Sequence, residues 1–229
     1  MKALFESTEF TLLLIFGSFL FGQWVFKKTR FPLFHPIIIS LCIIIPFLKI
    51  TGIDYKTFEE SSQFITFMLG PSVVALGYLL YEQMSYLKGN VVSIMLSLFL
   101  GSIVGILSVI ILARLTGADE TLIYSLEPKS VTTPIAMSIA EQSGGNVPLT
   151  AIVVLFCGIL GSIIGPPILK LMGIKSSVAK GLAMGASAHG VGTARAIEMG
   201  MIEGALSGLA IGIMGVMTAL LIPIIHQFI

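Results

Sequence analysis

The sequence has little charge for its length. Of 229 residues, 13 are Lys or Arg and 12 are Asp or Glu, so only 11% are charged, where a soluble domain carries about 25%. Too few polar side chains remain to cover a water-soluble globule of this size, which argues against a soluble enzyme and a disordered chain. The net charge of +1 provides no basic field for nucleic acid. The composition predicts an integral membrane protein of helices, because each spanning segment must satisfy its own backbone hydrogen bonds.

Cysteine and histidine are also scarce. Cys42 and Cys157 lie inside apolar runs, where a thiol acts as a small hydrophobic group. The three histidines, His35, His189 and His226, are too few to predict a catalytic metal cluster. H-E-x-x-H, G-x-S-x-G, Walker and C-x-x-C motifs are all absent from the sequence. We therefore expect neither an enzyme nor a bound metal or cofactor.

Uncharged stretches mark the candidate membrane segments. A full span needs about 20 apolar residues. The first stretch reads as a retained helix rather than a signal peptide, because its basic flank follows it. The sequence predicts one all-α polytopic membrane domain over residues 1–229, with about six to eight membrane segments in the lipid bilayer. The stretches are 10–26, 31–48, 61–81, 89–113, 130–140, 142–169, 181–194 and 204–229.

Three of these segments contain helix breakers and polar groups. The breaks lie at residues 70–72, 127–134 and 189–195. Proline removes a backbone donor and clashes with the preceding turn. Irregular backbone at membrane depth is tolerated where protein buries it or where it lines a watery cavity. The three breaks predict broken or re-entrant helices; the simpler alternative is a loop near the surface.

A weak internal repeat relates residues 61–115 to residues 119–172. Its clearest match is Leu100–Gly105 with Leu160–Gly165, both Leu-Gly-Ser-Ile-(Val/Ile)-Gly. If the segments at 61–88 and 119–143 re-enter, each copy crosses the membrane once and the copies are inverted. If both segments cross, the copies are parallel. The distribution of Lys and Arg does not decide between these topologies.

The break around Lys129 has the composition of a carboxylate site. A lysine at membrane depth needs a partner or a cavity, and a helix that begins after the proline presents free N–H groups to an anion. Ser130, Thr132 and Thr133 add hydroxyl groups. We expect these four residues to bind substrate. The alternative is a structural pair of Glu127 with Lys129 at a kink.

The break that begins at His189 adds a titratable group and a second cation. His189 and Thr193 are four residues apart and share a helix face if the helix is continuous. We expect His189, Thr193 and Arg195 to bind substrate, with Arg195 holding a carboxylate by two parallel hydrogen bonds, and His189 or Glu198 to carry a coupling proton. The alternative is a packing histidine, with Arg195 anchored to Glu198.

The first break and the spaced glycines complete the pattern. Gly70, Pro71 and Ser72 place a half-helix N-terminus that mirrors the one at Ser130, so we expect them to bind substrate as well. Small residues four apart let membrane helices approach closely, with partner binding as the alternative. Such glycines are Gly101/Gly105, Gly161/Gly165, Gly181/Gly185 and Gly200/Gly204/Gly208/Gly212.

These motifs resemble the LrgB/CidB family of bacterial membrane proteins over nearly the whole chain. The resemblance implies a multi-pass protein of the bacterial cytoplasmic (inner) membrane and carries two functions. One is antiholin-like control of murein hydrolase activity and autolysis with a small LrgA/CidA-type membrane partner. The other is transport, because the family is similar to the C-terminal half of the plastidial glycolate/glycerate translocator and has members linked to pyruvate uptake. The motifs are 69–76, 128–136, Gly144-Gly145, 158–161 and 189–195.

The charged breaks favour transport. A regulator without transport of its own has no need of a lysine, an arginine and a histidine at broken helices. We therefore expect a transporter of small monocarboxylates such as pyruvate and 2-hydroxy acids, acting with or without the LrgA/CidA-type partner and as a homo-oligomer.

Overall fold

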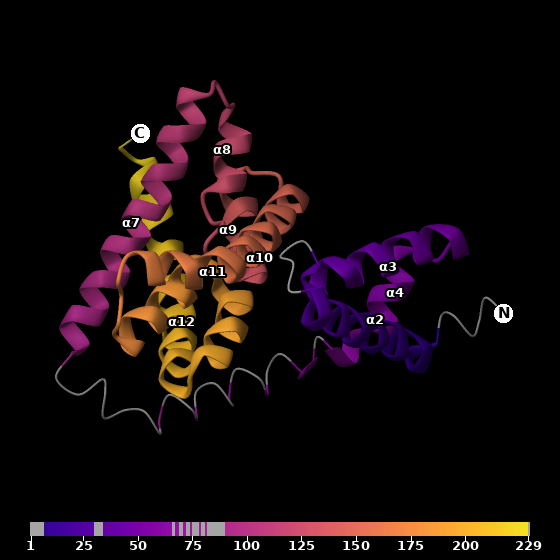
Figure 1. Ribbon diagram of the computed structural model, residues 1–229. Coiled ribbons are helices and arrows are strands. Elements are labelled where there is room, and N and C mark those ends of the chain that lie inside the picture. The colour runs from indigo at the N-terminus through magenta and orange to yellow at the C-terminus, as the bar shows by residue number, and fades with distance from the viewer. Residues whose placement is uncertain are drawn as a thin grey trace. The chain divides into compact units, whose positions relative to one another are not determined.

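The computed structural model describes residues 7–29, 34–65, 67–68, 71, 74, 78, 81 and 90–228 (Figure 1). All regular structure in these ranges is helical. The chain divides into two compact units, residues 1–74 and 75–229, which we describe one at a time.

The first unit is a small helical layer. α2 and α3 pack where Gly22 meets the backbone of Pro36, since a Cβ at this glycine would lie 2.8 Å from the Pro36 oxygen. The Thr11 and Ser61 hydroxyls, 2.9 Å apart, tie α4 to α2. Between α3 and α4 the chain bends by 120°. The helices are α2 (Thr8–Thr29), α3 (Pro36–Thr51) and α4 (Tyr55–Ser61).

The second unit combines three long helices with three shorter or bent ones. Across both units, four described helices (α2, α7, α10 and α12) are long and apolar enough to span a membrane, or five spans if the bent α3–α4 pair is one. The expected all-helical polytopic membrane protein is thus confirmed. The helices of the second unit are α7 (Val91–Leu115), α8 (Glu120–Leu126), α9 (Thr133–Ser143), α10 (Val147–Leu171), α11 (Ser177–Met199) and α12 (Met201–His226).

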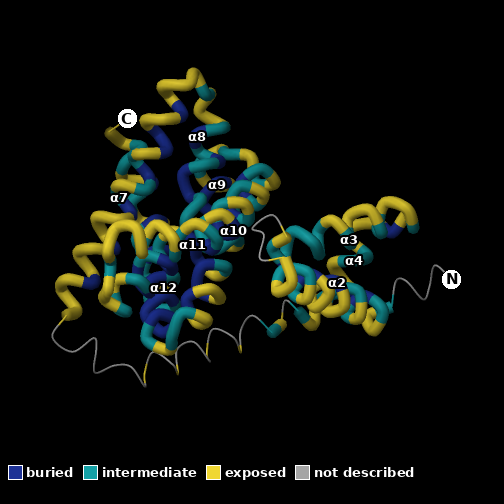
Figure 2. The backbone as a smooth tube through the Cα atoms, viewed as in Figure 1, coloured by how far each residue is buried: buried dark blue, intermediate teal, exposed yellow. Residues whose placement is uncertain are grey.

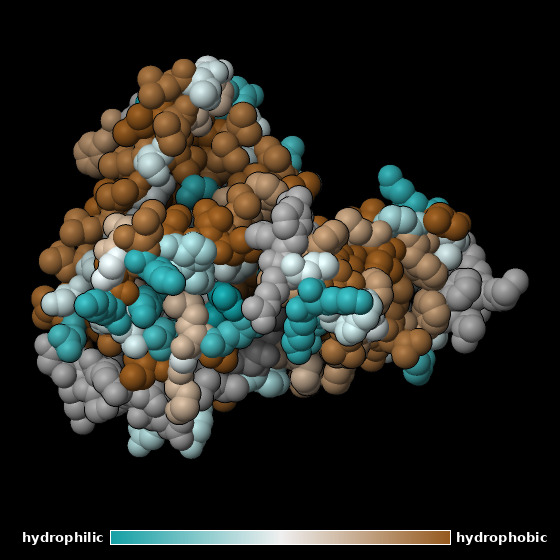
Figure 3. Space-filling model, in the orientation of Figure 1, coloured by the Kyte–Doolittle hydropathy of each residue, from teal (hydrophilic) through white to brown (hydrophobic). Residues whose placement is uncertain are grey.

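One face of α7 packs against the rest of unit 2, and the opposite face is exposed. Its buried residues recur every three or four positions, from Ile94 through Leu98, Ser102 and Ile106 to Ile110, which is the stripe expected of a helix packed on one side. The opposite face is exposed (Figure 2), and its large side chains, Leu100, Val104 and Ile111, are apolar, in keeping with the hydrophobic surface over α7 in Figure 3. Apart from Arg114 in the last turn, the exposed polar residues of α7 are serines, and Ser97 and Ser108 donate to backbone carbonyl oxygens of their own helix, so this face suits the bilayer.

The segment from α8 to α9 enters the second unit and turns back. α7 and α12 run in the same direction, because Ser102 bonds to Met214 and Ile110 clusters with Ile222 further along both helices. Ile123 of α8 and Ile139 of α9 lie in the cluster at the end where α7 and α12 finish. Val131, between them, lies in the deeper cluster with Leu98 and Ala210. We call this end the C-terminal end of unit 2.

α11 is a second hairpin, which enters from the opposite end. Non-helical backbone at Ala188 and His189 divides it. In its first half, Gly181 and then Gly185 meet Glu203 and then Ser207 of α12, so the two run parallel. In its second half the order reverses: Thr193 bonds to Ser207, and Ile197 meets Gly204. α11 is therefore two half-helices folded back on each other, with a tip at residues 188–190.

Two of the three predicted breaks are thus present, at 127–132 and at 188–189. Of the third, Gly70 and Ser72 lie outside the described residues, while Pro71 is helical and exposed. The repeated motifs lie in α7 and α10, both spanning helices; the duplication itself stays a prediction.

Candidate functional site

The tip of the first hairpin is the lysine-containing turn between α8 and α9. Half-buried Lys129 donates from Nζ to Ser130 Oγ at 3.2 Å. α9 starts at Thr133, with Pro134 in its first turn, and the Thr132 side chain makes no capping hydrogen bond. Because a helix cannot satisfy its own first N–H groups, this end presents donors and positive dipole to an anion. The expected hydroxyls and ammonium are therefore gathered at a helix N-terminus.

The tip of the second hairpin is held in place by His189. Its φ of 40° is the only positive value at a non-glycine among the described residues. The buried ring donates from Nε2 to the Val154 carbonyl oxygen of α10 at 2.9 Å. Since a carbonyl only accepts, Nε2 carries the hydrogen and Nδ1 is the acceptor nitrogen. The ring lies directly on Gly158, where a Cβ would come within 2.6 Å of Cε1.

Both tips meet the same stretch of α10. The turn that holds Lys129 lies there because Val131 packs in one cluster with Val154, and Thr150 of α10 bonds to Ser125 just before that turn. His189 contacts Val154 and Gly158. Residues 154 and 158 share one face of a helix. Two irregular turns from opposite ends of unit 2 thus converge near the middle of a spanning helix.

The remaining predicted residues lie away from this convergence or serve packing. Arg195 is on the exposed surface of α11, where it forms an ion pair with Glu198, also exposed. Thr193 is buried, and its hydroxyl lies 2.7 Å from that of Ser207. Arg195 and Glu198 thus form an exposed ion pair within α11, and their proposed roles in binding and proton coupling stay predictions.

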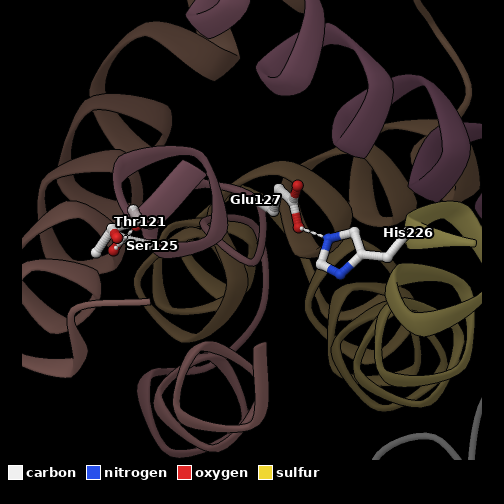
Figure 4. A network of polar contacts seen from close by, with 4 residues as sticks. All are labelled: Thr121, Ser125, Glu127 and His226. Carbon is white, nitrogen blue, oxygen red and sulfur yellow. Dashed lines mark hydrogen bonds and ion pairs between the residues drawn. The ribbon is translucent and has the colours of Figure 1, made fainter. Parts of the chain in front are cut away.

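A pair that sequence reasoning did not identify joins residues 99 apart. His226, at the end of α12, donates from Nε2 to Glu127 Oε2 at 2.7 Å (Figure 4). Glu127 lies outside the four spanning helices, and its side chain is only 1% exposed. Burial raises the pKa of this carboxyl, and the hydrogen bond from His226 acts in the opposite direction. The available signal was an acidic residue in an apolar region, which requires a partner.

Ser125 fixes the first hairpin to α10. Its hydroxyl donates to the Thr121 oxygen within α8 at 2.6 Å and accepts from the Asn146 N–H at 2.7 Å. Thr150 donates from its hydroxyl to the Ser125 carbonyl oxygen at 2.9 Å. Figure 4 shows Ser125 beside Thr121, on the turn of α8 before Glu127. This buried network positions the turn that carries Glu127 and Lys129.

Known proteins resemble the chain over nearly its full length. It is 35% identical over 97% of both chains to "Antiholin-like protein LrgB" of Bacillus subtilis (strain 168). Proteins of the same name from Bacillus cereus (strain B4264) and Bacillus anthracis (strain CDC 684 / NRRL 3495) are 34% identical over 91% of each chain. No solved structure matches the chain.

The family described as "LrgB-like family" matches residues 15–228. The spanning helices and the Bacillus relatives together confirm the expected multi-pass protein of the bacterial cytoplasmic membrane. The chain, in which two helix hairpins meet on α10, belongs to the LrgB-like family of antiholin-like membrane proteins.

Proposed function

We propose that this protein transports small monocarboxylates such as pyruvate, glycolate and glycerate. The observation that carries the proposal is the meeting of two interrupted helices, one with Lys129 and one with His189, at residues 154–158 of α10. Interrupted helices near the bilayer middle are where transporters place their substrate sites, because the broken backbone supplies polar groups that lipid does not.

In this proposal the carboxylate binds at the first tip. The N–H groups at the start of α9 and the hydroxyls of Ser130, Thr132 and Thr133 donate to its oxygens, and the Lys129 ammonium balances its charge. The hydrogen bond from Lys129 to Ser130 is weak enough in geometry, at 3.2 Å, to exchange for a carboxylate oxygen. A 2-hydroxy group on the substrate can then donate to Nδ1 of His189, whereas a 2-oxo group accepts from Nδ1 only when His189 carries the coupling proton.

The remaining predicted residues take secondary places in the proposal. Arg195 binds a carboxylate only after it leaves Glu198, so we assign it to a second step of transport rather than to the resting site. His189 or Glu198 carries the coupling proton. Gly70, Pro71 and Ser72 stay proposed substrate-binding residues, of which the structure describes only Pro71. The two hairpins enter from opposite ends of unit 2, which suits alternating access, since each can open one side.

The test is uptake of labelled pyruvate into proteoliposomes. Lys129→Gln should reduce uptake at least tenfold, because loss of one charge-assisted hydrogen bond costs about 1.5–3 kcal/mol. The matched control is Lys180→Gln. This lysine lies in the first turn of α11, far along the chain from the tip at residues 188–190. Equal uptake by both variants, with wild-type elution in gel filtration, would remove the carboxylate site from the proposal.

A second candidate function is antiholin-like regulation of murein hydrolase activity and autolysis. It is favoured by the printed names of the relatives. Gly101 and Gly105 of α7 and Gly212 of α12 have open space where a Cβ would stand, so these faces are accessible to an LrgA/CidA-type partner or to a second copy of the chain. Under this function without transport, Gly101→Leu should alter autolysis while Lys129→Gln should not.

A further inference from the structure

A groove runs along α9 from the first hairpin tip to the C-terminal end of unit 2. Its volume is about 620 Å³. Pro134, one residue into α9, lies at the inner end, and Ser143 and His226 lie at the outer end. The complete lining is Pro134, Ile135, Ser138, Ile139, Gln142, Ser143, Ala219, Pro223 and His226.

The groove is apolar inside and polar at its outer end. Ile135 and Ile139 line its length, whereas Gln142, Ser143 and His226 converge where α9 and α12 finish. Gln142 donates to Ser138 along the groove wall, and lipid supplies no partner for the further polar atoms of these residues. Water that enters the groove from one side would satisfy the hydrogen bonds of these polar groups.

His226 connects this groove to buried charge. Its ring lines the groove, donates to Glu127, and lies 4.6 Å from the Tyr124 ring, centroid to centroid. It also borders a second, small cavity of about 40 Å³ together with Arg114 of α7 and Glu120 of α8. The α9 wall contributes only the neutral Ser138, Gln142 and Ser143.

We propose that the α9–α12 groove is the path by which a small carboxylate reaches the Lys129 turn, and that the Glu127–His226 pair is the proton-binding group that controls it. This inference rests on the proposed function and adds its entry route and its regulation. With Glu127 ionised and His226 neutral, the pair carries a net charge of −1 and repels an anion. One added proton, taken from water at the outer end, makes the pair neutral, whichever of the two residues holds it. The neutral pair then lets the anion pass along the groove.

The first experiment measures the groove without requiring transport. Ser138→Cys is made in a chain whose Cys42 and Cys157 are replaced by alanine, and it is labelled in proteoliposomes with anionic and with cationic membrane-impermeant thiosulfonates. Labelling should occur from one side of the membrane only. Adding Glu127→Gln should raise the ratio of anionic to cationic labelling rates about fivefold at pH 8, because one nearby negative charge is removed.

The matched control is Val104→Cys in the same background, an exposed residue near the middle of α7, a helix that contributes no residue to the lining of the groove. It should react with neither charged reagent. An unreactive Ser138→Cys, or a rate ratio unchanged by Glu127→Gln, overturns the inference whether or not the protein transports pyruvate.

The second experiment separates the groove from the proposed function. Wild-type uptake of labelled pyruvate should rise several-fold from pH 8 to pH 6, and Glu127→Gln should be equally fast at both. Wild-type protein that takes up no carboxylate refutes the proposed function, while the labelling result still decides the groove. If the wild-type protein transports pyruvate and the Glu127→Gln variant keeps the same pH dependence, control by the pair is refuted. The proposed function then still stands.

Discussion

Replacing Gly158 of α10 by alanine should destabilise the protein through the His189 ring. An added Cβ would lie 2.6 Å from Cε1 and 2.7 Å from Nε2 of that ring, well inside van der Waals contact. The ring cannot easily move aside, because it is buried and bonded to Val154 at the tip of a hairpin. Overpacking of this kind costs about 2 kcal/mol.

A matched substitution gives the opposite sign. Gly101→Ala on α7 adds a Cβ that meets nothing within 4 Å, so it gains helix propensity of about 1 kcal/mol without a clash. Because Gly158→Ala gains the same helix propensity, the two variants should differ by the clash alone, about 2 kcal/mol, which corresponds to about 4 °C or more in the apparent melting temperature for a chain of this length.

The assay is thermal unfolding of purified protein in detergent, followed by the loss of monodisperse protein. Adding His189→Ala to Gly158→Ala should recover part of the lost stability, since it removes the group that clashes. A Gly158→Ala protein as stable as Gly101→Ala would refute the argument that the ring lies on Gly158 and holds the hairpin tip on α10.

Three further predictions follow from buried contacts. Glu127→Gln should change the pH dependence of stability: because burial raises the folded pKa of Glu127, the contribution of its proton to stability is present below the unfolded pKa and is lost as pH rises through the folded pKa. From pH 4.5 upward the melting temperature of wild-type protein should fall relative to the variant; a constant difference contradicts this. Ser125→Ala leaves the Asn146 N–H without its acceptor and should cost about 1–3 kcal/mol by the same melting assay, with exposed Ser108→Ala as control. Thr193→Val should be destabilising, and Thr193→Ser neutral, if the bond to Ser207 joins α11 to α12; equal melting of the two variants would show that it does not.

Local composition was enough to predict where helices break, but not what surrounds a break. Pro128 with Lys129, and His189 with Gly190, each place a helix-destabilising residue beside a titratable one, which disfavours an uninterrupted membrane helix, so both interruptions could be predicted from their own residues. That α11 doubles back could not, because the reversal depends on Gly181 and Gly185 approaching α12 on one side and Thr193 bonding to it on the other. Such approaches involve residues far apart in the chain.

Two side-chain pairs, Arg195 with Glu198 and Glu127 with His226, show the same limit of prediction from sequence. Arg195 and Glu198 are three residues apart on one helical half, so their pairing could be considered from spacing alone. His226 and Glu127 are 99 residues apart and meet only because α12 returns to the end where α8 enters. No local pattern predicts a contact of that separation.

The sequence alone determined that this protein lies in a lipid bilayer, and it determined the family to which the protein belongs. With 11% charged residues and long uncharged runs, the chain can satisfy its backbone only as helices in a bilayer, and its motifs carry the LrgB resemblance that the relatives confirm. The tertiary structure decided where the polar groups lie. The turns that carry Lys129 and His189 both pack on α10, and Glu127 bonds to His226 at the end of a groove. The physical reason is that hydropathy acts on each residue separately, whereas a buried polar group requires a partner that only the packing of distant helices supplies.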